Sequence, residues 1–117
     1  MKLPISETSY LLIDEDFMDN AIVKDVVDEE SAKGLGAMTA LLLQLIMFDD
    51  GMASMGDIRP LAALLQTSCG YLFHIIKDYR VFRLTPDRLS FYSPYLRKTE
   101  DAEGGIAWLL DTPATEE

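Results

Sequence analysis

The chain is poor in the residues that form disulfides and metal sites. It contains one cysteine, Cys69, and one histidine, His74, among 117 residues. A single cysteine excludes an internal disulfide, and a structural zinc site needs four cysteine or histidine ligands. We therefore expect neither a metal nor another cofactor, and a reducing compartment.

Long hydrophobic runs are also lacking. The most apolar stretch, Leu35 to Phe48, is too short to span a bilayer and is interrupted by Gly36, Thr39 and Gln44. The first residues of the chain lack the apolar core of a signal peptide. These features predict a cytoplasmic protein without a membrane partner.

Basic residues are half as numerous as acidic ones, 10 against 20, so the net charge is −10. This balance opposes tight non-specific binding to nucleic acids, which requires lysine and arginine to displace counterions. The charge is unevenly distributed, however. Residues 67 to 98 carry six basic and two acidic side chains, whereas residues 99 to 117 carry six acidic and no basic ones. The positive surplus therefore lies in one third of the chain.

The segment Leu35 to Phe48 is apolar nearly all round. Apolar residues recur at helical spacing on one side, and the opposite side also carries Leu43, Met47 and Phe48. An exposed amphipathic helix would be polar there. We therefore predict a central helix covered on several sides, with Ser31 as its N-cap and the following Asp-Asp-Gly sequence as its end.

The other predicted elements are short. In chain order, we expect a helix over residues 21–29, a strand over 52–55, and helices over 58–65 and 69–79. A hairpin follows, with strands over 81–84 and 89–93 and a turn at 85–88. Two helices joined by a short turn form a helix-turn-helix, and the strand near residue 53 would add to the hairpin.

This element order predicts a winged helix-turn-helix. We expect a mainly α fold with a small β-hairpin or three-stranded wing (α+β) over residues 1–98. Residues 99–117 are expected to form an acidic, partly disordered C-terminal tail. Trp108 and Leu109 lie in an apolar island of that tail, after two glycines, where they could fold back or bind a second copy.

Several motifs carry a resemblance to a known family. They are an aromatic and apolar opening before an acidic cluster (10–17), a Gly-x-Gly entry to a Leu-rich helix (34–48), a Leu-Ala-x-Leu-Leu helix (61–65), and Ile-Ile-Lys-Asp-Tyr-Arg-Val-Phe leading into the hairpin (75–82). From Tyr10 to about Lys98, the chain resembles the N-terminal winged-helix domain of DnaD-like replication proteins. These occur in Firmicute and Bacteroidetes genomes, their phages and mobile elements, and include a family of unknown function.

The resemblance implies a non-enzymatic adaptor in DNA replication or mobile-element maintenance, with weak, sequence-independent DNA binding. The alternative is a protein-interaction or oligomerisation module that has lost DNA binding. In the first case, the partners would be DNA and a replication protein. In the second, they would be another protein or a second copy in a homodimer.

The candidate nucleic-acid-binding residues are the basic residues from the end of the last helix through the hairpin: Lys77, Arg80, Arg83, Arg88, Arg97 and Lys98. Such residues could lie along one side and contact phosphates, as in winged-helix DNA binders. The alternative is solvated surface charge. The exposed stripe of the helix offers no Arg, Asn or Gln for base contacts, so sequence-specific recognition is not expected.

The candidate protein-interface residues are Phe73, Trp108 and Leu109. An outward-facing Phe73 would suit an interface, but a different helix phase would place it in the core. His74 and Cys69 have no carboxylate neighbour at a spacing that suits a nucleophile and base, so we expect no catalytic pair. The acidic group between residues 14 and 19 does not fit the spacing of an EF-hand loop, so we expect no metal there.

Overall fold

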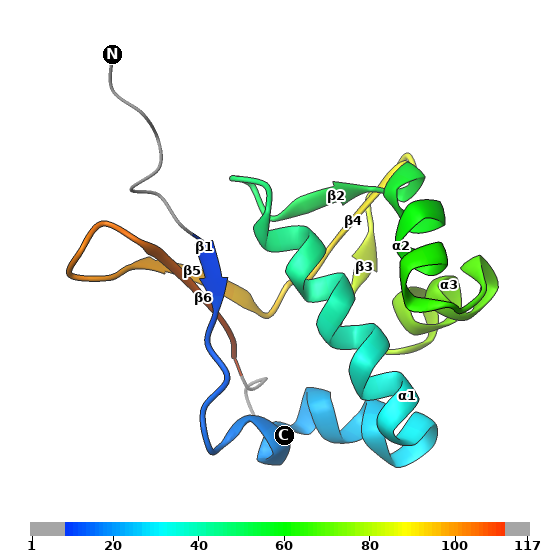
Figure 1. Ribbon diagram of the computed structural model, residues 1–117, viewed down its shortest axis with the longest axis horizontal. Coiled ribbons are helices and arrows are strands. Elements are labelled where there is room, and N and C mark those ends of the chain that lie inside the picture. The colour runs from blue at the N-terminus through cyan, green and yellow to red at the C-terminus, as the bar shows by residue number, and fades with distance from the viewer. Residues whose placement is uncertain (1–8, 112–117) are drawn as a thin grey trace.

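The computed structural model describes residues 9–111 and has an α+β architecture with three α-helices and two small sheets (Figure 1). The helices are α1 (Ala21–Ile46), α2 (Ile58–Leu65) and α3 (Cys69–Asp78). The strands are β1 (Ser9–Leu11), β2 (Met52–Ser54), β3 (Arg83–Leu84), β4 (Ser90–Tyr92), β5 (Leu96–Glu100) and β6 (Ile106–Leu110). Two 3-10 turns, η2 (Phe17–Asp19) and η3 (Met55–Asp57), precede α1 and α2.

Helix α1 combines the two helices that the sequence predicts over 21–29 and 35–48. Its interior contains one non-helical residue, Ser31, with φ 62° and ψ −149°. Ser31 is therefore the kink between the two parts, which corrects the prediction that it caps a separate helix. The cap of the whole helix is Asn20, whose side chain accepts a hydrogen bond from Ile22 N at 2.7 Å.

The kink brings the backbone at Gly34 close to the preceding turn. A Cβ atom at Gly34 would lie 2.2 Å from Glu30 Cβ, a distance that real side chains do not reach. Glycine at this position therefore permits the tight passage from the first to the second part of α1. The same passage places Glu30 beside α3, where its carboxylate contacts Tyr71 and His74.

Helix α1 ends at Ile46, two residues before the predicted end. Gly51 does adopt a positive φ of 70°, as expected for a glycine in this sequence, but it lies in the turn that leads into β2. A Cβ atom at Gly51 would lie 3.2 Å from the Trp108 ring. The glycine therefore meets two requirements, a left-handed backbone and close contact with an aromatic side chain.

Helices α2 and α3 lie close to their predicted positions. Helix α2 ends with Gln66 in the left-handed conformation, at φ 58°. Ser68 then caps α3 by accepting a hydrogen bond from Tyr71 N at 3.0 Å. Asp57 occupies the N-cap position of α2, but its side chain makes no capping hydrogen bond. The turn between the two helices therefore depends on Gln66 and Ser68.

One sheet contains the predicted hairpin and has the strand order β2-β4-β3. Both pairings are antiparallel, with Ala53 and Leu84 each opposite Phe91. In the turn between β3 and β4, the Thr85 hydroxyl donates to Asp87 at 2.6 Å, and Arg88 has φ 63°. The strand near residue 53 therefore does join the hairpin, as the sequence predicts.

The second sheet corrects the expectation of a tail after residue 98. Its order is β1-β6-β5, with β6 parallel to β1 and antiparallel to β5. Strand β5 continues through Glu100, so the expected boundary falls inside a strand. Residues 106–110 form the central strand of this sheet, since hydrogen bonding on both sides satisfies their backbone better than a detached segment would. The disorder expected beyond residue 111 lies outside the described residues.

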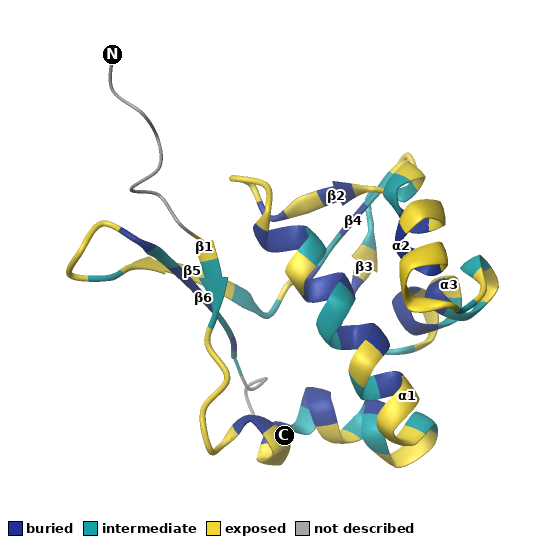
Figure 2. Cartoon of the chain, in the orientation of Figure 1, coloured by how far each residue is buried: buried dark blue, intermediate teal, exposed yellow. Residues whose placement is uncertain are grey.

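The core lies between the inward side of α1, helices α2 and α3, and the β2-β4-β3 sheet (Figure 2). Its largest fully buried side chains include Met38, Leu42, Leu72, Ile75 and Phe91. Phe82 packs edge-on against Phe91, with ring centroids 5.8 Å apart. Among the helices of residues 9–111, none has the length and apolar content to cross a membrane.

Candidate functional site

Helix α1 exposes an apolar stripe on the side that faces away from the core. Leu42 is fully buried, whereas its neighbour Leu43 is 45% exposed and Met47, one turn on, is 70% exposed. Gly36, which is exposed, and Ala40, which is partly buried against the core, continue this line toward the kink at spacings of three and four residues. The prediction of a central helix packed on several sides is confirmed for the sides that meet β1, β2 and α3, but the side with Leu43 and Met47 lies open.

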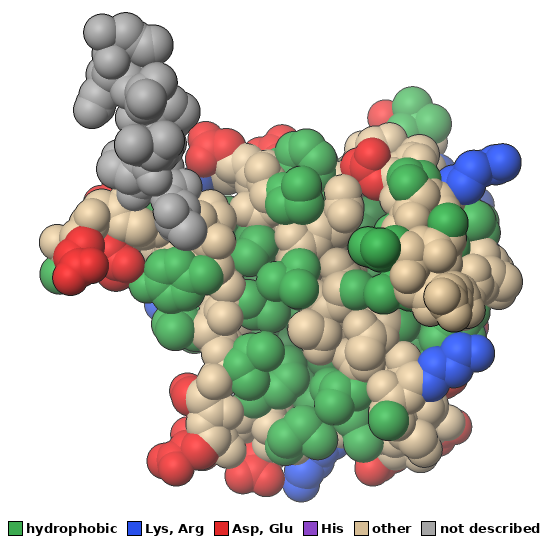
Figure 3. Space-filling view, in the orientation of Figure 1, with side chains coloured by type: hydrophobic (Ala, Val, Ile, Leu, Met, Phe, Trp, Pro, Cys, Tyr) green, Lys and Arg blue, Asp and Glu red, His purple; other side chains and the backbone are tan. Residues whose placement is uncertain are grey.

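Helix α2 and the turn after α1 extend the apolar surface. Leu64 and Leu65 on α2 are exposed, and so are Phe48 in the turn after α1 and Met52 at the start of β2. Figure 3 shows hydrophobic side chains across most of the central part of one face of the molecule. Leu65 also lines a hollow of about 250 Å³ together with Gly36 and Tyr71. We call Gly36, Ala40, Leu43 and Met47 the α1 stripe.

Phe73 lies on the outer side of α3 and is 37% exposed, as the interface prediction requires. Trp108 is 5% exposed and Leu109 is partly buried, because both belong to the central strand β6. Trp108 therefore does not form a detachable apolar anchor. It packs beside the end of α1.

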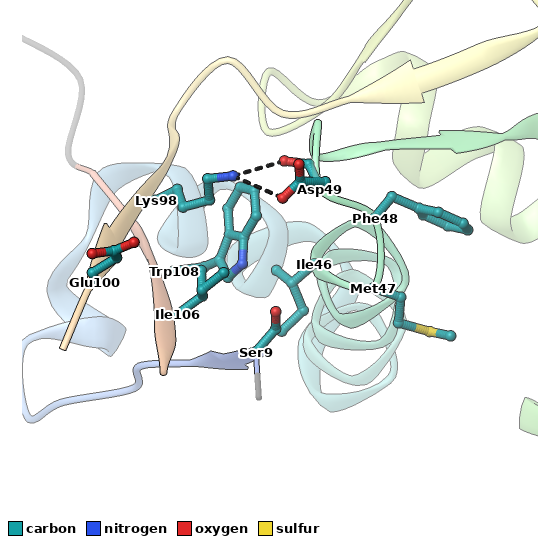
Figure 4. Close-up of a pocket in the computed structure, with 9 residues that line it drawn as sticks. All are labelled: Ser9, Ile46, Met47, Phe48, Asp49, Lys98, Glu100, Ile106 and Trp108. Atoms are coloured by element: carbon teal, nitrogen blue, oxygen red, sulfur yellow. Dashed lines mark hydrogen bonds and ion pairs between the residues drawn. The ribbon is translucent and has the colours of Figure 1, made fainter. Parts of the chain in front are cut away.

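Trp108 lines a hollow of about 440 Å³ between the end of α1 and the second sheet (Figure 4). Lys98 reaches across this hollow, donating to the carboxylate of Asp49 at 3.1 Å, and its ammonium lies 5.5 Å from the Trp108 ring centroid. The buried indole Nε1 of Trp108 has no hydrogen-bond partner among the described residues. These contacts hold the second sheet against the end of α1.

The structure separates the six candidate nucleic-acid-binding residues into two groups. Lys77, Arg80 and Arg83 line one hollow of about 430 Å³ between the end of α3 and β3. Arg88 lies on the turn of the same hairpin, exposed to solvent. Arg97 and Lys98 belong instead to β5 in the other sheet. The expectation that all six follow one helix and its wing is therefore wrong, because the last two lie on a different sheet.

Half of these six cations already bind acidic side chains. Arg80 Nε lies 2.8 Å from Asp25, Arg97 Nε lies 3.0 Å from Asp111, and Lys98 pairs with Asp49. Within residues 9–111, no acidic side chain lies within 4.0 Å of the charged groups of Lys77, Arg83 or Arg88. These three are therefore the cations most accessible to a phosphate. Exposed ion pairs such as the one at Arg80 contribute little to stability and exchange readily.

A polar cluster that the sequence did not predict joins α3 to the kink of α1. The Glu30 carboxylate accepts hydrogen bonds from the hydroxyls of Tyr71 and Tyr79, at 3.0 and 2.6 Å, and contacts His74 Nε2 at 2.6 Å. The other ring nitrogen of His74 lies 2.5 Å from Asp78. Because both ring nitrogens face carboxylates, both must donate, so His74 is an imidazolium.

These contacts shift the ionisation of the cluster. Hydrogen bonds from Tyr79, His74 and Tyr71 lower the pKa of Glu30 to about 2. Hydrogen bonds to Glu30 and Asp78 raise the pKa of His74. Burial and the bond to Glu30 raise the pKa of Tyr71 to about 12. The Glu30 carboxylate therefore stays ionised near neutral pH, and its hydrogen bonds hold α3 against the kink.

The sequence contained part of the signal for this cluster. Asp78 follows His74 by four residues on one helix, a spacing that brings side chains together, and the expectation that His74 lacks a suitably spaced carboxylate is therefore wrong. Glu30 is 44 residues away in the chain and gives no such signal. No group of three His, Cys, Asp or Glu side chains within residues 9–111 is placed to share a metal ion.

Comparisons of the chain with protein-family models, with curated proteins and with solved structures gave no match.

Proposed function

We propose that the chain is a non-enzymatic winged-helix adaptor whose principal activity is to bind a partner protein through the α1 stripe. The proposed winged-helix arrangement is supported by the order α1, β2, α2, α3, β3, β4 and by the pairing of β2 beside the β3-β4 hairpin. The same order underlies the resemblance to DnaD-like replication proteins. Replication or mobile-element maintenance is therefore the proposed setting.

The observation that carries this proposal is the exposure of two large apolar side chains, Leu43 on α1 and Met47 directly after it, next to residues that the core buries. A helix that only filled the core would be polar on its open side. Exposed apolar side chains that gather on one face mark protein-interaction sites. Methionine and leucine on such a face suit a partner that packs an apolar surface onto the stripe.

The charge of the molecule favours a partner with basic residues around its apolar surface. The chain carries a net charge of −10, and Asp49 and Asp50 lie two and three residues after Met47, beyond the C-terminal end of α1; Lys98 already pairs with Asp49. The helix dipole adds negative potential at that end. Charge complementarity accelerates association with such a partner and disfavours acidic competitors.

Site-specific photo-crosslinking tests this proposal. A benzoylphenylalanine residue placed at Met47 should crosslink a distinct protein in the cells that make this chain. The same probe at Lys24, exposed before the kink of the same helix, should not capture it. The purified partner should then bind at least about tenfold more weakly to a Leu43→Lys, Met47→Lys variant, since truncations at an interface centre cost more than about 1 kcal/mol. Equal crosslinking from both positions would contradict the proposal.

A second candidate activity, weak contact with DNA phosphates, is favoured by the convergence of Lys77, Arg80 and Arg83 on one hollow. Such binding would be independent of sequence and sensitive to salt. Fluorescence anisotropy with duplex and single-stranded DNA at low salt measures it. The Lys77→Glu, Arg83→Glu variant should lose binding. The Lys24→Glu, Arg59→Glu variant, which changes the net charge equally, should retain most of it. An absence of binding by the native chain would reject this second activity and leave the first untouched.

A further inference from the structure

Strand β5 lies at the edge of its sheet and carries a self-complementary charge pattern. In the order β1-β6-β5, its outer side has no partner strand within residues 9–111. Its last four residues and the one after them read Arg97, Lys98, Thr99, Glu100, Asp101. Two cations and two anions thus flank a central threonine symmetrically. Antiparallel pairing of this sequence with itself places opposite charges together.

The hydrogen bonds of the sheet determine which backbone groups β5 offers at its outer edge. Asp101 N donates to Gly105 O at 2.9 Å, and Asp111 N donates to Tyr95 O at 2.8 Å, so the backbone groups of Tyr95 and Asp101, which flank β5, point toward β6. The direction of the backbone groups alternates along a strand. Lys98 and Glu100 therefore direct their N–H and C=O groups away from β6, to the open edge.

We propose that two copies of this chain associate through β5, in antiparallel register about a two-fold axis at Thr99. This register pairs Lys98 with Glu100 of the partner subunit, and each pair exchanges two backbone hydrogen bonds. Arg97 then lies opposite Asp101 of the partner subunit, and Thr99 lies opposite its own copy. Two sheets of three strands would become one continuous sheet of six.

The neighbouring registers place like charges together. A two-fold axis at Lys98 brings Lys98 opposite its own copy, and an axis at Glu100 brings two carboxylates opposite each other. Opposite charges across a strand pair are stabilising, and like charges directly opposite are destabilising. Only every second residue of β5 directs its backbone N–H and C=O groups to the open edge. A slip of one residue would place these groups opposite residues whose own groups point away, so the possible registers differ by two residues. Charge therefore selects the register centred on Thr99.

The two cations retain capacity for the second copy, whereas the Asp101 carboxylate already accepts hydrogen bonds from the Tyr10 hydroxyl and from Glu103 N and Gly105 N. Arg97 uses only its Nε to bind Asp111. Lys98 has three N–H donors, and the hydrogen bonds to the carbonyl and carboxylate of Asp49 do not use all of them. The side chains of Arg97 and Lys98 are 55% and 39% exposed. Figure 4 shows Lys98 and Glu100 extending from the same strand beside Trp108. The existing ion pairs therefore hold β5 in place without exhausting its donors.

Charge reversal tests the pairing in the full chain by sedimentation equilibrium. Lys98→Glu and Glu100→Lys should each weaken dimerisation about tenfold or more, because two attractive pairs become repulsive. An equal mixture of the two single variants should form a heterodimer. One chain then has acidic residues at positions 98 and 100 and the other has basic residues at both, so each 98–100 pair again joins opposite charges. The variant with both substitutions should dimerise like the native chain. A native chain that stays monomeric, or single variants that dimerise unchanged, would overturn the proposal.

A disulfide test fixes the register independently and remains informative if a charge variant fails to fold. In an antiparallel pair, directly opposite residues that exchange no backbone hydrogen bonds lie about 4.5 Å apart at Cα, which suits a disulfide. Thr99 meets its own copy in such a position. In a chain with Cys69→Ser, Thr99→Cys should therefore oxidise to a covalent dimer. Lys98→Cys in the same background should not, because its own copy is offset along the strand in this register. Preferential crosslinking of the Lys98→Cys chain would overturn the assignment.

Discussion

Leu42 and Leu43 are neighbours on α1 with opposite environments, and alanine substitution should lower the free energy of unfolding far more at Leu42 than at Leu43. Leu42 is fully buried. Its truncation should cost about 2–5 kcal/mol, the range for a buried leucine that leaves a cavity. Leu43 is 45% exposed, so truncation removes only part of the roughly 1.5–3 kcal/mol expected for full burial, on the order of 1 kcal/mol, and leaves no cavity.

Urea denaturation followed by circular dichroism measures both free energies of unfolding. The two variants should show the same slope with denaturant as the native chain, so that the shift in midpoint reports stability alone. Equal losses at the two positions would refute the reasoning. They would mean that α1 is covered on both sides, as the sequence alone predicted.

Contacts at the kink, the cap and the turn after α1 give further expected outcomes. The lowered pKa of Glu30 contributes stability above about pH 4.5 that is lost as the pH falls toward 2, and a Glu30→Gln variant should flatten this part of a denaturation profile against pH. The raised pKa of His74 contributes stability below about pH 6.5 that is lost as the pH rises through the folded-state pKa, and His74→Gln should remove this loss. Asn20→Ala should cost about 1–2 kcal/mol in urea denaturation, because Asn20 caps α1 and donates to Leu110 O at 3.1 Å. Gly51→Ala should lower the melting temperature, whereas Gly36→Ala, whose Cβ would meet open space in a helix, should raise it slightly.

The elements with local signals were predictable from the sequence. The spacing of apolar residues predicted α2 and α3 to within one residue at each end. The Thr85 to Arg88 turn predicted the hairpin, and the glycines around residues 52–55 predicted the short strand that pairs with it. In each case, the decisive residues lie within about ten positions of one another, so local propensity and tertiary structure agree.

The second sheet was not predictable in the same way. Strand β5 is rich in charge and β6 is a short apolar island, so neither has the alternation of a typical half-buried strand. Strand β6 also pairs with β1, which places Tyr10 opposite Ala107 across nearly the whole chain. Such non-local pairing leaves no periodic signal in one sequence. The expectation of a tail therefore failed because tertiary pairing, and not local pattern, forms these strands.

The α1 stripe shows a different kind of failure. Hydrophobicity on all sides of a helix predicts burial only if the rest of the chain supplies enough surface to cover it. Here α2, α3 and the β2-β4-β3 sheet cover the side with Met38 and Leu42, and the side with Leu43 and Met47 stays open. The residue pattern identified the helix correctly. It could not distinguish a second core face from a binding face.

Solvent access to the methionine methyl groups tests the exposed stripe most directly. In a methyl NMR spectrum of the full chain, a soluble nitroxide broadens signals from side chains that it can approach. Met47, which is 70% exposed, should broaden strongly, whereas Met38 on the buried side of the same helix should keep its line width. Equal protection of both methyl groups in dilute solution would contradict an open apolar stripe on α1, and with it the proposed protein-binding function.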